Sequence, residues 1–168
     1  EEYKNGLLYD TERDASLVER LRRIMLRTVW AITEQMKLGK FDTVDSEVSF
    51  RMDKEKQTYI GRVDRIDTME TEENIYVKIV DYKTGKKDLS LSDLYYGLQL
   101  QLMVYLRAAV DKQTRRSKKM VIPAGVLYYH IEDPFVTSRL DFEEKRTYLL
   151  NELLMRGLVN EEDPVLPS

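Results

Sequence analysis

The sequence contains no cysteine among its 168 residues, which excludes disulfides and thiolate-bound metal sites within this segment. It contains a single histidine and no apolar stretch approaching the roughly 20 residues of a membrane-spanning helix. No signal peptide is visible, and the first residue is not methionine. We therefore expect a cytoplasmic domain without a membrane partner, cut from a longer protein.

The chain also lacks net positive charge, since its formal charge is −3. This argues against a module that simply coats DNA. It does not argue against a nuclease, because acidic metal ligands themselves add negative charge. With 42% hydrophobic and 34% charged residues, the composition is globular, and the length predicts one domain over residues 1–168.

Hydrophobic periodicity predicts an α/β protein with the element order α-β-β-β-α-β-α. The first three strands form an antiparallel meander, and a basic loop follows the second helix. The predicted helices are 12–38, about 90–111 and 143–156, the last ended by Gly157; the predicted strands are 44–52, 57–67, 74–82 and 121–131; the loop is 114–119.

Asp81 and Lys83 stand two residues apart on the third predicted strand, so their side chains share one face. An exposed salt bridge explains such a pair, but the preceding Ile79-Val80 favours a central strand. Gly85 permits close backbone approach. A divalent metal beside a phosphate would use both the carboxylate and the ammonium.

Asp64 and Asp67 lie on the preceding strand, within the segment GRVDRID that begins at Gly61. Their spacing of three turns them to opposite faces, so at most one should join Asp81. Solvated acids at a strand end are the alternative interpretation.

Gln101 and Tyr105 share one face of the following helix, at i and i+4. The combination of Gly61-x-x-Asp64, Asp81-Tyr82-Lys83 and Gln101-x-x-x-Tyr105-x-x-Ala108 resembles RecB-type nuclease domains of the PD-(D/E)XK superfamily. The segments from Gly61 to Asp67 and from Tyr95 to Gln101 are most similar to the AddB family of bacterial helicase–nuclease proteins.

The resemblance implies a restriction-endonuclease-like core, with a mixed central sheet flanked by helices. It implies that Asp64, Asp81 and the carbonyl of Tyr82 bind Mg²⁺, for which Mn²⁺ could substitute. Lys83 would sit by the attacking water, and Gln101 and Tyr105 would line the site. The implied function is an exodeoxyribonuclease domain of a double-strand-break repair complex, acting on a single DNA strand fed by a helicase and its partner subunit. A non-catalytic module for DNA guidance or subunit docking is the alternative.

Two expected features are missing. RecB-type nucleases carry a metal-ligand histidine on an early helix, whereas His130 lies in the fourth strand, where we expect an ordinary strand residue. AddB proteins carry cysteines for an iron–sulfur cluster, which this segment cannot hold. Glu47 could make an outer contact to the site, although a solvated strand face is the preferred interpretation.

Other residues have surface interpretations. Four tyrosines could stack on bases, although packing is preferred, and four cations could contact phosphates or form a solvated loop. They are Tyr95, Tyr96, Tyr128 and Tyr129, and Arg115, Arg116, Lys118 and Lys119. Because the cations are scattered apart from these and the pair Lys86-Lys87, we predict weak DNA binding by this domain alone.

Overall fold

The computed structural model describes residues 11–160, apart from 55–56, 86–89, 91, 93–95 and 97–99. The described residues separate into two compact units. Unit 1 holds residues 11–37 and 131–154, and unit 2 holds residues 38–130 and 155–160.

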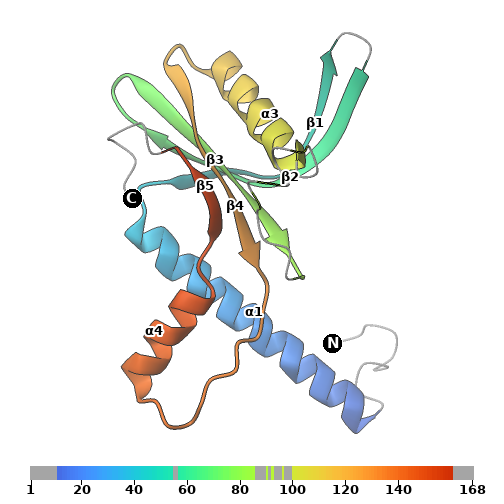
Figure 1. Ribbon diagram of the computed structural model, residues 1–168, viewed down its shortest axis with the longest axis vertical. Coiled ribbons are helices and arrows are strands. Elements are labelled where there is room, and N and C mark those ends of the chain that lie inside the picture. Colours follow the sequence, from blue (N-terminus) through green and yellow to red (C-terminus); the bar gives the residue numbers. More distant parts are fainter. Residues whose placement is uncertain are drawn as a thin grey trace. The chain divides into compact units, whose positions relative to one another are not determined.

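Unit 2 is built on a five-stranded mixed sheet with the spatial order β1-β2-β3-β4-β5 (Figure 1). The strands are β1 (Asp42–Lys54), β2 (Gln57–Glu70), β3 (Asn74–Lys83), β4 (Met120–His130) and β5 (Arg156–Val159). The first three form the predicted antiparallel meander, whereas β3 and β4 are parallel. Parallel neighbours need a crossover connection, and α3 (Leu100–Arg116) lies within it.

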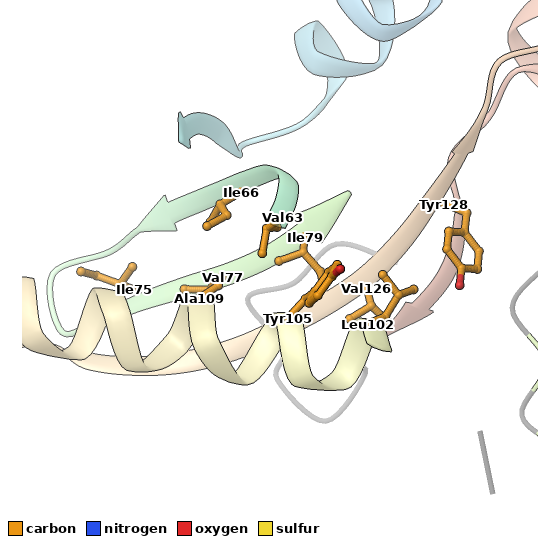
Figure 2. Packing of buried hydrophobic residues seen from close by; sticks show 10 residues of the cluster. All are labelled: Val63, Ile66, Ile75, Val77, Ile79, Leu102, Tyr105, Ala109, Val126 and Tyr128. Atoms are coloured by element: carbon orange, nitrogen blue, oxygen red, sulfur yellow. The ribbon is translucent and has the colours of Figure 1, made fainter. Parts of the chain in front are cut away.

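The core of unit 2 lies between α3 and the sheet, as Figure 2 shows. Leu102, Tyr105 and Ala109 recur at helical spacing and are buried against β2, β3 and β4. Val48 and Phe50 of β1 pack against the same cluster, as their shared side of the predicted strand requires. The predicted α/β class and its mixed sheet are confirmed.

The last strand was missed by the sequence pattern. The predicted helix over 143–156 is too long, because α4 (Phe142–Glu152) ends before Gly157, which belongs to β5. A Cβ at Gly157 would lie 2.0 Å from the carbonyl oxygen of Val126, and one at Gly125 would lie 2.7 Å from that of Leu158. These glycines therefore permit close pairing of β4 and β5 and do not act as a helix stop.

Unit 1 contains α1 (Glu12–Leu38) and α4. Asp141 caps α4: its side chain accepts from the Glu144 N–H at 2.9 Å, and its own N–H donates to the Glu144 carboxylate. Arg23 and Arg27 bind Asp133, with Nη–Oδ distances of 2.5 and 2.6 Å. These contacts fix the segment between β4 and α4 against α1.

The apolar residues that recur at helical spacing along α1 are only partly buried. Leu17, Leu21 and Met25 are half exposed or more, while Ala31 is fully buried. None of the helices in the described ranges is long and apolar enough to span a membrane. The predicted first turns of the helix around residues 90–99 lie mostly outside the described residues, as do Tyr95 and the pair Lys86-Lys87.

Candidate metal-dependent nuclease site

The two predicted metal-ligand aspartates come from neighbouring antiparallel strands. Arg65 pairs with Val80, so the next step of the register sets Asp64 of β2 across from Asp81 of β3. Asp64 Oδ2 accepts a hydrogen bond from the Tyr82 N–H at 2.9 Å, which fixes the carboxylate against β3. The chain thus brings two acidic side chains together from positions 17 residues apart.

Lys83 pairs with Asp81 on the face that alternation predicts, with 2.6 Å between Nζ and Oδ2. Burial raises the pKa of Asp81, as does the nearby Asp64 charge, while Lys83 opposes the rise. For Lys83, burial favours the neutral form, but hydrogen bonding and charge from Asp81 outweigh it and raise the pKa. The Lys83 ammonium is therefore stabilised beside the Asp81 carboxylate.

Asp67 is separated from this pair. It is fully buried, and both oxygens contact Arg65 at 2.7 Å, while Thr43 Oγ1 donates to Oδ1 at 2.8 Å. Lys78 lies 3.7 Å from Oδ2. Asp67 is therefore part of a separate cluster with Arg65 and Thr43. Of the two β2 aspartates, Asp64 is the one that lies beside Asp81.

Gln101 and Tyr105 of α3 interact with each other, since Gln101 Nε2 donates to the Tyr105 hydroxyl. The Tyr105 ring packs edge-on against Phe50, with centroids 5.3 Å apart (Tyr105 is drawn in Figure 2). A Cβ at Gly61 would lie 2.8 Å from Tyr105 Cε1 and 2.9 Å from Phe50 Cε1. The glycine of the first motif therefore makes room for the tyrosine of the third. The described contacts of Gln101 and Tyr105 are with each other and with Phe50, and not with Asp64 or Asp81.

Strand β4 adds two residues whose place beside Lys83 the sequence did not indicate. Tyr128 pairs with Asp81 and His130 pairs with Lys83 in the parallel register. Lys83 Nζ lies 5.5 Å from the centroid of the Tyr128 ring, and His130 Nδ1 lies 2.7 Å from the Gly85 carbonyl oxygen. Because this register is set by tertiary pairing, no local signal could have found it.

The structure separates the tyrosines proposed for base stacking. Tyr128 and Tyr129 are 6% and 0% exposed, so base stacking is wrong for both and the packing interpretation holds. Tyr96 is 73% exposed. Glu47 is exposed and pairs with Arg62 at 2.9 Å, as a solvated strand face requires.

The predicted basic loop begins later than expected, since Thr114, Arg115 and Arg116 form the last turn of α3. Their helical backbone extends the amphipathic pattern by more than a turn beyond the predicted end at Asp111. Lys119 pairs with Glu70 and donates to the Thr71 carbonyl oxygen. Arg115 and Lys118 are exposed.

The atoms available to bind a metal at this site are oxygens. They belong to the Asp64 and Asp81 carboxylates and to the carbonyl of Tyr82, which follows Asp81 on β3. Within the ranges that the structure describes, no three or more His, Cys, Asp or Glu side chains gather as a metal cluster. Two carboxylates suit Mg²⁺, which retains several waters and takes few protein ligands. The residues present therefore fit a hydrated magnesium ion better than a closed structural metal site.

A model of the PD-(D/E)XK nuclease superfamily matches residues 2–164. The chain belongs to this superfamily. The match spans both acidic strands and α3, and it confirms the resemblance drawn from the three motifs.

Three similar proteins are AddB proteins, each named as one of the subunits of an ATP-dependent helicase/deoxyribonuclease. The protein of Ruminiclostridium cellulolyticum is 39% identical over 93% of this chain and 15% of its own length. Those of Alkaliphilus oremlandii and Lachnoclostridium phytofermentans are 38% and 40% identical over 94% and 99% of this chain, and 15% and 14% of their own lengths. The chain thus spans about one-seventh of these relatives.

Proposed function

We propose that this PD-(D/E)XK domain is a metal-dependent deoxyribonuclease that hydrolyses phosphodiester bonds. The convergence of Asp64 of β2 with Asp81 and Lys83 near the end of β3 carries the proposal. Two carboxylates beside a lysine ammonium match the needs of phosphoryl chemistry, in which negative charge must be both held and neutralised.

Each residue has a distinct proposed role. Asp64, Asp81 and the Tyr82 carbonyl would hold Mg²⁺ or Mn²⁺, which when bound supplies Lewis-acid charge and lowers the pKa of a bound water. Lys83 orients the attacking water and offsets charge on the phosphate, and its pairing with Asp81 fixes the ammonium before substrate arrives. Gln101 and Tyr105, joined by their hydrogen bond, would steady the strand being cut.

The names of the relatives suggest the setting. We propose exonuclease action within a bacterial helicase–nuclease that repairs double-strand breaks, in the cytoplasm, with single-stranded DNA delivered by helicase action and with a partner subunit. The relatives are far longer than this chain, which supports dependence on further domains. Incubating the 168-residue chain with linear duplex and single-stranded DNA in Mn²⁺ tests this. Rapid degradation of duplex by the chain alone would refute the dependence.

A non-catalytic role in DNA guidance or docking is the second candidate. The absence of a third acidic or histidine side chain beside Asp64 and Asp81 in the described residues favours it. The paired Asp81 and Lys83 favour the nuclease, because a guiding module has no use for a buried carboxylate with a raised pKa.

Metal-dependent thermal stabilisation separates the two candidates. A ligand that binds only the folded state at ten times its dissociation constant stabilises by about 1.4 kcal/mol, which is about 3–6 °C for a domain of this size. Asp81→Asn should abolish the rise with Mg²⁺ or Mn²⁺, while Asp111→Asn should retain it as a matched control. An unchanged response in Asp81→Asn would refute the metal assignment.

A further inference from the structure

A groove of about 750 Å³ lies in unit 2 between β1 and α3. Four of its lining residues are basic and one is acidic, in a chain whose net charge is −3. The basic residues are Arg51, Lys112, Arg115 and Arg116. The groove is therefore a local concentration of positive charge on a protein that lacks it overall.

Two acidic side chains near this groove, among those that the structure describes, are already engaged. Asp111 pairs with Arg107 at 3.1 Å. Asp45 of β1 pairs with both Lys112 at 2.9 Å and Arg116 at 3.2 Å. One carboxylate shared by two cations neutralises only part of their charge, and Arg115 adds an exposed guanidinium. A surplus of positive charge faces the groove.

Apolar side chains also line the groove, and one of them contacts a motif residue. Val48 and Phe50 line it, and Phe50 packs against Tyr105, which bonds to Gln101. Cations and an aromatic ring in the lining of one groove suit a single nucleic-acid strand, with phosphates on the cations and a base or sugar on the ring. A long acidic peptide would match the cations but would not use the aromatic ring.

We propose that the β1–α3 groove binds the backbone of a single nucleic-acid strand that runs from the Gln101–Tyr105 pair toward the end of α3. The proposal deepens the proposed function and rests on it, since it gives a path to the strand being cut. It concerns residues outside the acidic site, so the two ideas can fail separately.

The test measures binding of a fluorescent 20-nucleotide oligothymidylate to the 168-residue chain by anisotropy, in EDTA at 50 mM salt. Each phosphate contact to a single strand contributes a salt slope of about 0.7, which at this salt is about eightfold in affinity. Arg115→Ala should therefore weaken binding about eightfold and lower the slope by about 0.7. Arg22→Ala in α1, which removes the same charge elsewhere, should stay within about twofold of wild type.

Asp45→Asn gives the opposite expectation, because it frees Lys112 and Arg116 for phosphates. It should tighten binding and steepen the salt dependence, with the melting temperature as the check on folding. Equal effects of Arg115→Ala and Arg22→Ala, no tightening by Asp45→Asn, or no measurable binding by wild type would overturn the groove. Tighter binding of the matching duplex, or displacement by polyglutamate at equal charge, would overturn the single-strand assignment.

A cross-link provides a second readout that does not depend on affinity. Because the chain has no cysteine, Ala108→Cys places a single thiol on the α3 wall of the groove, and Ser138→Cys places one on the exposed segment of unit 1. An oligothymidylate carrying a pyridyl disulfide should exchange with the first thiol in preference to the second, releasing thiopyridone. Equal yields would refute the path. All these measurements omit divalent metal, so their failure leaves the Asp81→Asn result, and with it the nuclease proposal, standing.

Discussion

Asp64 and Asp67 lie three residues apart on β2, yet their carboxylates have very different partners. Asp67 receives two contacts from Arg65 and one from Thr43, and Lys78 lies nearby, so its charge is fully neutralised. Asp64 receives one backbone N–H, and Asp81 lies across from it on β3. A fully neutralised acid stabilises the fold, whereas two acids brought together with one lysine retain capacity for a cation.

The largest expected effect on the cleavage rate concerns the lysine that distinguishes the Asp64–Asp81 cluster. Lys83→Ala should slow cleavage by about 10²–10³-fold under conditions that support wild-type activity, because it removes charge stabilisation in the transition state. Metal-dependent stabilisation should persist, since Lys83 is not a ligand. Lys119→Ala, which removes an ammonium paired with Glu70, should leave the rate unchanged. A loss of less than about threefold in Lys83→Ala would contradict the role, because that is under about 1 kcal/mol of barrier.

The comparison between the two aspartates predicts opposite phenotypes. Asp67→Asn should destabilise by about 3–5 kcal/mol, because it leaves the buried Arg65 guanidinium uncompensated, and it should spare the metal response. Asp64→Asn should cost less than about 1 kcal/mol, since the amide oxygen can still accept from Tyr82, and it should abolish the metal response. Urea unfolding with and without Mn²⁺ measures both. If the two variants behave alike, the division between them is wrong.

The Gly61 contact links the Asp64 strand to α3, and it can be tested with another glycine as control. Gly61→Ala should cost about 1–3 kcal/mol, because the new Cβ meets the Tyr105 and Phe50 rings. Gly85→Ala meets nothing within 4 Å and should be neutral or stabilise by up to about 1 kcal/mol. In a Phe50→Leu background the Gly61→Ala penalty should shrink. An unchanged penalty there would mean that Phe50 does not contribute to the clash.

The sequence predicted those parts of the site that depend on local periodicity. Alternation along β3 placed Asp81 with Lys83, and alternation along β2 separated Asp64 from Asp67. It could not reveal that Tyr128 and His130 lie beside Lys83, because the parallel register of β3 and β4 depends on how the α3 crossover packs on the sheet. It also could not reveal β5. Glycine is needed at position 157 because the strand there passes close to the carbonyl of Val126, which is 31 residues earlier in the chain. Periodicity reports the face of a residue, while its cross-sheet neighbours depend on the assembled fold.

The smallest expected effect tests whether a further acid belongs with Asp64. Glu47 lies across from Asp64 in the β1–β2 register, since Ser46 pairs with Arg65 and Val48 pairs with Val63. Its ion pair with Arg62 is exposed, so Glu47→Ala should change stability by no more than about 0.5 kcal/mol and leave the metal response intact.

Glu47 also has φ of 55°, which lies in the left-handed region that glycine adopts without strain. Glu47→Gly should therefore be more stable than Glu47→Ala, by about 1 kcal/mol, which reverses the usual order in a strand. Urea unfolding of the two variants measures this difference. If Glu47→Ala loses metal-dependent stabilisation, Glu47 is a third acid of the site, and the division between neutralised and available carboxylates extends to β1.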